Sequence, residues 1–422
     1  MTTSFLHGPE VLEIDSGIRP IRTVTSAVIG VAGTAPNADA NEFPLNTPVL
    51  VSGSRTKASK LGTSGTLPKA IDGIFDQIGA TLVVIRVAEG ADENATIANL
   101  VGSSTGFTGV HGFMAAESVV GVIPKVLIAP GFTHQTTGGN ANPVVSELLG
   151  LASSSAGIGT RLRATVIADG PNTTDADAIT HAALHADSRI LLVDPWVKVS
   201  DASGNLVDEP PSARVAGLIA KSDAERGFWW SPSNQPISGI VGTSRPVSFA
   251  LGDQNSTANN LNELKIATII REDGFRLWGN RSTGPDGMFQ FLSVRRTADM
   301  IQESLLRSHL WAVDRCINKT YLQDVKESVN QYLRSLKARG AIIGGECWVD
   351  PEANQLSNIA NGNATFSFDF TPAYPSERVT FNSHITNDYL TEFIFDISDV
   401  DNASNITDDQ EDDDTTDTES EE

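Results

Sequence analysis

The chain has little positive charge, few cysteines and no long hydrophobic run. It holds 30 Lys and Arg against 52 Asp and Glu, and this net charge of −22 disfavours direct nucleic-acid binding, which rewards clustered cations. Its two cysteines, Cys316 and Cys347, have no CxxC neighbour, which favours free thiols in a reducing compartment over a disulfide framework. No stretch approaches the roughly 20 apolar residues that span a bilayer, and residues 1–6 lack the basic and apolar regions of a secretory signal. We therefore expect neither a membrane span nor a signal peptide.

The signatures of metal and dinucleotide sites are weak. Asp177, His181 and His185 have a helical spacing of four, which could place three ligands on one face. No further ligand at motif spacing supports a metal, so we interpret them as a partly exposed polar stripe. The glycines of residues 157–162 follow a predicted helix and lack the third glycine of a dinucleotide loop, so we interpret them as a turn. No metal and no cofactor are predicted.

A catalytic triad is equally poorly supported. Ser244 could be combined with Asp169 and His111, but the chain order would then be His, Asp, Ser, whereas subtilisin-like proteases run Asp, His, Ser. The aromatic residues of 228–230 could form a ligand platform, although a packing wedge between domains is the more ordinary interpretation. The sequence thus predicts no catalytic residue and no enzyme.

The remaining composition is that of a folded protein with an acidic end. The chain has 422 residues, 40% of them apolar and 19% charged, which suggests two or three domains. Residues 401–422 carry eleven carboxylates and no Lys or Arg, which is half of the net charge. Such a segment repels itself and buries nothing, so we expect a disordered, solvated tail.

The first two thirds of the chain alternate predicted strands with predicted helices. The strands are continuous apolar runs, as in sheets that are covered on both faces. Apolar residues three to four apart indicate the helices. Strands are predicted over 27–33, 48–51, 81–87, 125–130, 164–169 and 188–195, and helices over 67–78, 143–151 and 175–186. This order predicts an α/β domain with a largely parallel central sheet.

The pattern of predicted elements changes after about Gly274. A helix is predicted over 297–317, and a second helix, with a capping box at Thr320, is predicted to end at Gly340. Residues 365–371 alternate phenylalanine with polar residues, which predicts an antiparallel strand with one buried face. The C-terminal region is therefore predicted to be a compact α+β domain.

Both ends of the chain have the sequence pattern of β-strands, but neither strand belongs to a predicted core of the chain itself. Within 7–20, Leu12 and Ile14 alternate with Glu13 and Asp15. Within 388–398, apolar residues again alternate along the segment. A terminal strand exposes unpaired backbone groups, which can pair with a neighbouring chain. The residues that we predict to carry these inter-subunit strands are Val11, Leu12, Glu13, Ile14, Phe393, Ile394, Phe395 and Ile397.

Five separated segments give the chain a resemblance to a known family. They are residues 7–11 with 17–21, 227–234 (Gly-Phe-Trp-Trp-Ser-Pro-Ser-Asn), 259–262 (Asn-Asn-Leu-Asn), 274–281 (Gly-Phe-Arg-Leu-Trp-Gly-Asn-Arg) and 294–297 (Val-Arg-Arg-Thr). In this order they resemble the contractile tail sheath proteins of myophages and related contractile injection particles. The resemblance covers nearly the whole chain up to about Val400, and the acidic tail departs from it.

The resemblance implies a domain arrangement. It implies an outer α/β domain, subtilisin-like in fold but without its triad, and an inner α+β domain. Both terminal arms would be donated to the inner domains of neighbouring subunits. The implied boundaries are an N-terminal arm at 1–22, the outer domain at 23–274, the inner domain at 275–387, an exchanged strand at 388–400 and the acidic tail at 401–422.

The resemblance also implies a function and partners. Such proteins form stacked hexameric rings around an inner tube, and they contract from a metastable extended state to drive the tube through the target cell envelope. The implied partners are other copies of the chain, the tube protein, and baseplate and tail terminator proteins, without nucleic acid or membrane insertion. The particle, a virion or an extracellular contractile particle, would be assembled in the host cytoplasm. The basic residues that we expect to contact the tube are Lys326, Arg334, Lys337 and Arg339.

Two other interpretations stay open at the level of sequence. An α/β hydrolase-like enzyme with an oligomerisation module would need a nucleophile, and Ser244 would be the residue to test. A static shell or tube subunit would polymerise through the same arms but show one lattice geometry.

Overall fold

The computed structural model describes residues 21–396, except 137, 153–161 and 202. The chain divides after Pro375 into two units. None of the helices formed by the described residues combines the length and apolar character needed to cross a bilayer.

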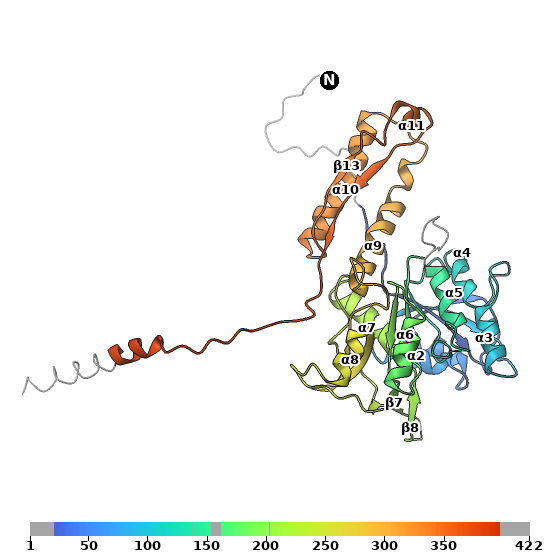
Figure 1. The fold of residues 1–422 in the computed structure, drawn as a ribbon. Helices are drawn as coiled ribbons and strands as arrows, with labels where there is room; N and C mark the ends of the chain where they lie inside the picture. The colour runs from blue at the N-terminus through green and yellow to red at the C-terminus, as the bar shows by residue number, and fades with distance from the viewer. Residues whose placement is uncertain (1–20, 137, 153–161, 202, 397–422) are drawn as a thin grey trace, which may run out of the picture. The chain divides into compact units, whose positions relative to one another are not determined.

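A mixed sheet lies at the centre of the first unit (Figure 1). Among the described residues it has eight strands, in the spatial order β11 (Phe275–Trp278), β10 (Ile266–Arg271), β6 (Ile190–Val193), β5 (Thr165–Asp169), β4 (Val126–Ile128), β1 (Val28–Thr34), β3 (Thr81–Val87) and β2 (Pro48–Ser52). The six inner strands are parallel, and the edge strands β2 and β11 run antiparallel to their neighbours. The predicted largely parallel sheet is confirmed.

Helices cover both faces of this sheet, which explains why its strands are apolar throughout. In β1, Ile29 and Val31 face one helical layer, and Val28 and Ala32 face the other. The first layer contains α2 (Leu67–Phe75) and α7 (Ser212–Glu225). The second contains α3 (Glu93–Val101), η2 (Gly109–Ala115), α5 (Pro143–Ala152), α6 (Asp175–Ala183) and α8 (Thr257–Glu263). The remaining short helices of the α/β part are α1 (Arg55–Ala58), η1 (Ser59–Leu61) and α4 (Ala116–Val120).

A smaller sheet extends the α/β part. It has the order β8 (Leu206–Glu209), β7 (Val197–Ser200) and β9 (Gly242–Thr243), and both pairs are antiparallel.

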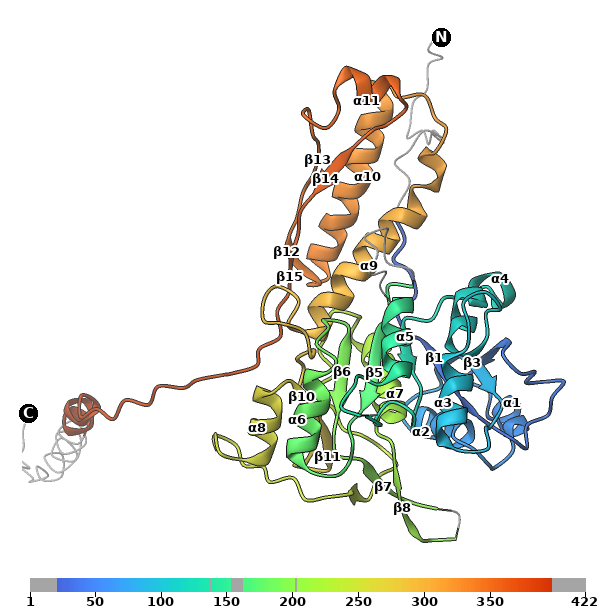
Figure 2. The ribbon, with the colours of Figure 1, turned by 45° about the vertical axis from the view of Figure 1, so that its right-hand side comes forward.

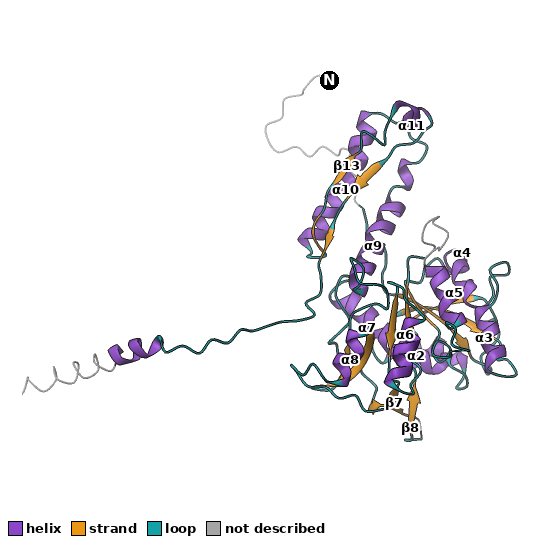
Figure 3. Cartoon of the chain, in the orientation of Figure 1, coloured by secondary structure: helices purple, strands orange, loops and turns teal. Residues whose placement is uncertain are grey.

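The second part of this unit is built on two long helices, α9 (Leu292–Ser308) and α10 (Lys319–Ala338), which run side by side in both views (Figures 1 and 2). A two-stranded ribbon packs against α10, as the strand colouring of Figure 3 shows. Its pairs are β13 (Cys347–Val349) with β14 (Phe366–Phe368) and β12 (Ile342–Gly344) with β15 (Thr371–Pro372). The elements η3 (Leu310–Ala312) and α11 (Leu356–Ala360) complete this helical part. The predicted strand over 365–371 is confirmed, and its phenylalanines pack on the core of the helical part.

Three helix ends differ from prediction. The helix α9 begins at Leu292 and ends at Ser308, not over 297–317, and the His309 ring lies 2.7 Å from the Leu305 carbonyl oxygen at the last turn. The helix α10 is capped by Asn318, whose side chain accepts the Tyr321 N–H, rather than by Thr320. In both helices, a hydrogen bond between a side chain and the backbone at the helix terminus accompanies the observed boundary.

One domain boundary also differs. Residues 275–278 form β11 of the large sheet, and Leu277 lies in its core, so the α/β part extends to about residue 291 rather than 274. Ile21 and Val24 pack on the core of the helical part, and the boundary of the N-terminal arm at residue 22 stays a prediction. Cross-strand and side-chain contacts therefore decide this boundary, although the sequence pattern changes at Gly274.

The second unit, described for residues 376–396, exposes every side chain. Residues 389–396 are helical in the single chain. The predicted strand is therefore wrong for the chain by itself. A helix satisfies its backbone groups internally, whereas a strand needs a partner strand. The strand at 388–398 therefore stays a prediction for the assembled protein. The N-terminal strand of residues 7–20 and the tail of 401–422 lie outside the described residues.

Candidate functional site

The carboxyl edge of the parallel sheet is where α/β proteins usually bind ligands. Here Asp169, at the end of β5, is fully buried. It accepts hydrogen bonds from the Ser212 N–H at 2.8 Å, the Ser212 hydroxyl at 2.9 Å and the Thr133 hydroxyl at 3.0 Å. Burial raises the pKa of this carboxyl to about 6. A carboxylate of the protein itself thus sits at the N-terminus of α7, where a ligand anion would otherwise bind.

The conceivable triad is not assembled. The Ser244 hydroxyl donates to the Asn172 side chain, and the neighbouring Arg245 pairs with the buried Asp194. His111 lies 3.3 Å from a Glu147 carboxylate oxygen instead. Among the residues that the structure describes, no histidine bonds to Ser244, so none of them is placed to act as its general base.

The helical Asp-His-His set does not form a shared site. His181, on α6, and His185, just after this helix, are buried, not partly exposed as we predicted, because both rings pack against the loop after β4. The His181 ring lies 3.0 Å from the Thr133 carbonyl, and the Asn142 N–H donates to the His185 ring at 3.2 Å. Asp177 stays exposed. The described residues contain no cluster of three potential metal ligands.

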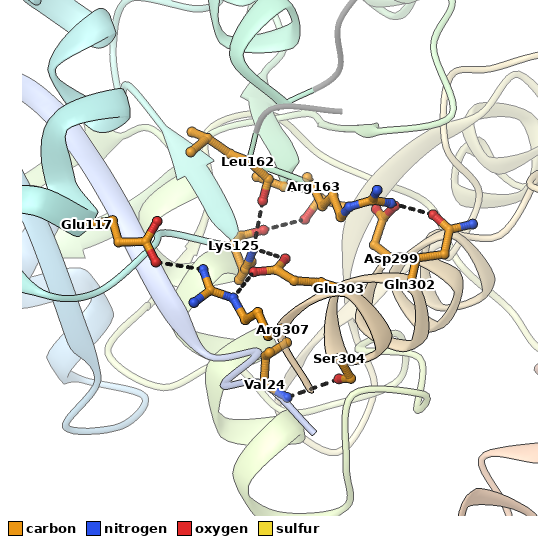
Figure 4. Close-up of polar contacts among 12 residues, drawn as sticks. Val24, Glu117, Lys125, Leu162, Arg163, Asp299, Gln302, Glu303, Ser304 and Arg307 are labelled. Atoms are coloured by element: carbon orange, nitrogen blue, oxygen red, sulfur yellow. Dashed lines mark hydrogen bonds and ion pairs between the residues drawn. The ribbon is translucent and has the colours of Figure 1, made fainter. Parts of the chain in front are cut away.

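A buried polar junction joins α9 to the α/β part (Figure 4). The Lys125 ammonium, beside β4, pairs with the Glu303 carboxylate of α9 and donates to the Leu162 carbonyl at 2.7 Å. Both charged residues are less than 10% exposed. Arg307 donates to Glu303 and to Glu117, each at 2.9 Å. Burial lowers the pKa of Lys125, and the Glu303 charge opposes that change.

Further ion pairs extend this junction along α9. Arg189 holds Asp299 in a two-pronged pair, with one contact at 2.8 Å, and Arg295 joins it at 2.8 Å. Arg296 pairs with Asp223 of α7 at 2.9 Å. A buried pair of this kind contributes little stability by itself, but loss of one partner is costly. These ion pairs fix α9 to α7 and to the residues that precede β4 and β6.

Sequence reasoning missed this junction. The signal was present, because Arg295, Asp299, Glu303 and Arg307 recur every four residues along α9, with the two carboxylates between the two arginines. Their partners Lys125 and Arg189 each precede a strand far away in sequence, so only the fold reveals the pairs.

The N-terminal segment enters the molecule between the long helices. The Val24 N–H donates to the Ser304 hydroxyl at 3.1 Å, and the Thr23 hydroxyl lies 3.3 Å from the Tyr332 hydroxyl. The Ser26 carbonyl accepts from Arg296 at 3.5 Å. Phe228, from the aromatic segment, is buried in the same core and Trp229 packs against that core, as the packing interpretation predicted, whereas Trp230 is 49% exposed.

The basic residues of the helical part have different surroundings. Arg334 pairs with Glu327, and Arg339 lies over the Trp229 ring at 5.1 Å. Lys326 lines an apolar groove of about 410 Å³ whose walls come from α10, β13 and α11. Lys337 is exposed. Of the predicted arm residues, Phe393, Ile394 and Phe395 are exposed on the helix of 389–396, and Val11, Leu12, Glu13, Ile14 and Ile397 lie outside the described residues.

Three family descriptions match the chain. They are the phage tail sheath protein central domain over residues 105–283, the phage tail sheath C-terminal domain over 285–386 and the N-terminal region of domain III of tail sheath protein Gp18 over 26–87. The structure of the chain is similar to the PVC sheath complex of an extracellular contractile injection system in the contracted state, with a TM-score of 0.66, 18% identity and coverage of 93% of this chain and 100% of that one. It is also similar to the contracted helical sheath of the anti-feeding prophage, with a TM-score of 0.66, 21% identity and coverage of 92% and 100%.

Relatives of higher identity extend over nearly the whole chain. A prophage major tail sheath protein of Pseudomonas aeruginosa (strain UCBPP-PA14) is 39% identical over 396 residues, which cover 93% of this chain and 99% of the relative. The tail sheath protein of Escherichia phage P2 is 32% identical over 405 residues, which cover 93% and 98%. The chain therefore belongs to the phage tail sheath protein family, as a structural subunit of a contractile tail and not an enzyme.

Proposed function

We propose that the chain polymerises as stacked hexameric rings around an inner tube and contracts from a metastable extended state to drive the tube through the target envelope. The observation that carries this proposal is the similarity to tail sheath proteins over 93% of the chain. The solved sheaths that share its fold carry the description "contracted state", which suits a subunit with more than one lattice arrangement.

The terminal arms would link the subunits. Val11–Ile14 and 393–397 are proposed to be donated as strands to the helical parts of neighbouring copies. Two features support this. The ribbon of the helical part has only two strands per pair among the described residues, which leaves strand edges at which a further strand could pair. The described chain also begins at residue 21, and Thr23 and Val24 contact Tyr332 of α10 and Ser304 of α9.

The buried junction would transmit force. Because Glu303 and Asp299 are tied to Lys125 and Arg189, the helical part cannot turn on the α/β part without breaking buried ion pairs. Rotation during contraction is then borne by the contacts between subunits. The extended state would be a kinetically trapped arrangement, and no nucleotide is needed.

Contacts with the tube are proposed for the basic side of α10. Lys326, Arg334, Lys337 and Arg339 would form exposed ion pairs, which are weak and salt-sensitive, as a contact that must break on contraction requires. Lys337 is the sharpest candidate, since Arg334 and Arg339 already have partners within the subunit.

The remaining partners and the location follow from the family. Baseplate and terminator proteins would bind the two ends of the sheath, and one solved neighbour is a component of the anti-feeding prophage baseplate. The outer α/β domain would have a subtilisin-like fold without a triad. The sheath would be assembled in the cytoplasm of the bacterial host and act in the virion or an extracellular particle.

The test is negative-stain electron microscopy of the full chain expressed alone, beside a variant that lacks residues 1–20. We expect hollow tubes from the full chain and unassembled subunits from the variant. If both stay unassembled in conditions that favour sheath formation, polymerisation through the arms is wrong.

A further inference from the structure

Two buried histidines hold the loop after β4, and their rings have opposite hydrogen-bonding roles. The His181 Nε2 atom lies 3.0 Å from the Thr133 carbonyl oxygen, which can only accept, so this ring donates. The Asn142 N–H donates to the His185 Nε2 atom at 3.2 Å, so this ring accepts and carries its single proton on Nδ1. The two ring centroids lie 4.9 Å apart.

A second proton affects these two contacts differently. On His181 it would bind to Nδ1, which has no hydrogen-bond partner among the described residues, and the bond from Nε2 to Thr133 would persist. On His185 it would bind to Nε2 and point at the Asn142 N–H. Two donors cannot form one hydrogen bond, so the contact between His185 and Asn142 must break. Of the two histidines, only His185 therefore makes a contact that acid removes.

The residue that His185 holds is the start of α5. Asn142 is fully buried, and its Oδ1 atom accepts two N–H groups in the first turn of α5, at 2.9 and 3.1 Å. Its Nδ2 atom donates to the carbonyls of Phe132 and Gln135, each at 3.1 Å. One side chain thus caps α5 and closes the loop of residues 132–142. A displacement of Asn142 would release both.

The surroundings of His185 do not stabilise a positive charge. Among the described residues no carboxylate pairs with this ring, and burial holds the pKa of His185 below its usual value of 6.5. The adjacent His181 would repel the charge, and His134 of the same loop stands edge-on to Trp196. The carboxylates of the surrounding elements contact other groups: Glu93 contacts Gln135, Glu147 contacts His111, Asp169 contacts Ser212, Asp177 contacts Thr174, Asp187 contacts the Arg189 N–H and Asp286 contacts Lys265.

We propose that His185 is an acid-sensitive latch, whose protonation releases Asn142 so that the loop of residues 132–142 and the first turn of α5 open while the central sheet stays folded. The open form binds the extra proton more strongly than the closed form does. Closure is therefore fully favoured above pH 6.5 and weakens as the pH falls below it. One such proton raises the opening equilibrium constant by up to about tenfold for each pH unit. The latch belongs to the single subunit and does not depend on assembly.

The main test is hydrogen exchange of the unassembled full chain at pH 7.5 and pH 5.5, with each rate divided by the intrinsic rate at that pH. Protection of peptides within 130–147 should fall by up to about tenfold at the lower pH. Peptides of β3 should stay better protected than these at both pH values, because local opening leaves the sheet intact. A fall of less than twofold, or equal protection of the two sets at pH 5.5, would overturn a local latch.

Matched histidine variants test which ring responds. The amide oxygen of His185→Gln can still accept the Asn142 N–H but does not titrate, so this variant should keep its protection at pH 7.5 and lose most of the change at pH 5.5. His181→Gln keeps a donor toward Thr133 and should lose less of the change, and His384→Gln, at an exposed position, should lose none. If His185→Gln responds like the parent chain, or loses no more than His181→Gln, His185 is not the latch.

Two further measurements do not depend on the folding of His185→Gln. Asn142→Ala removes the clamp at every pH, so peptides within 130–147 should exchange faster already at pH 7.5; unchanged exchange would show that Asn142 does not close the loop. In ¹³C NMR of the histidine-labelled parent chain, the signal that is missing from His185→Gln should titrate with a midpoint below pH 6.5. A midpoint at or above pH 6.5 would reverse the sign of the linkage and overturn the proposal.

Discussion

The buried pair of Lys125 and Glu303 gives the sharpest prediction about stability. Glu303→Gln removes the charge opposite a lysine that is 4% exposed and whose other described acceptor is the Leu162 carbonyl. An ammonium left without its counter-charge in such a site costs about 3–5 kcal/mol of unfolding free energy. A glutamine keeps one of the two oxygens that accept from Lys125 and Arg307, so one of these cations also loses its acceptor.

The double variant separates the pair from its surroundings. Lys125→Met with Glu303→Leu replaces both charges by apolar groups, and such replacements are neutral or stabilising by about 1–4 kcal/mol. We therefore expect the double variant to be more stable than Glu303→Gln alone. The control is Glu327→Gln, which breaks the exposed pair with Arg334 and should cost no more than about 1 kcal/mol.

The assay is urea denaturation of the unassembled chain, followed by tryptophan fluorescence, with midpoints compared at equal slopes. The same variants are then assembled and examined by electron microscopy. If Glu303→Gln shifts the midpoint no more than Glu327→Gln does, the junction does not hold α9 to the α/β part, and the argument for force transmission fails.

Three further predictions concern pH, salt and the tail. Burial lowers the pKa of His181 to about 4, so the stability it supports is present above pH 6.5 and is lost as pH falls toward 4, by about 3 kcal/mol. Burial raises the pKa of Asp169 to about 6, which acts in the opposite direction between pH 6 and 3.8 and partly hides this loss. His181→Gln should therefore gain stability relative to the parent chain on acidification from pH 7 to 4 in urea titrations, and a pH-independent difference would contradict this. Lys337→Glu should weaken binding to the isolated tube and flatten its salt dependence, whereas Lys57→Glu, on α1 of the α/β part, should not. Equal effects of the two variants in a co-sedimentation assay would remove Lys337 from the contact. Deletion of residues 401–422 removes eleven carboxylates and should promote lateral aggregation of sheaths at low salt, measured by light scattering; unchanged scattering at every salt concentration would refute a repulsive role.

The sequence predicted what depends on local patterns. The continuous apolar runs at 27–33 and 81–87 predicted strands covered on both faces, and the corresponding strands β1 and β3 are neighbours in the sheet. The apolar spacing of 67–75 likewise determined α2. These elements follow from the period of burial, which is written in consecutive residues.

What the sequence could not predict depends on distant partners. Glu303 is an ordinary charged helix residue until the fold brings Lys125 beside it. Phe275–Trp278 joined the large sheet because β10 offered an open edge, although the preceding sequence suggested a new domain. Residues 389–396 carry both an alternating and a helical apolar pattern, and the conformation depends on whether a partner strand is present.

Helical reconstruction of the assembled full chain by cryo-electron microscopy tests the central claim most directly. The account predicts that residues 388–398 of one subunit are extended and paired with the β13–β14 ribbon of another, and that residues 7–20 also cross to a neighbour. A map in which both termini fold back on their own subunit, with rings joined only by side-chain contacts, would contradict it.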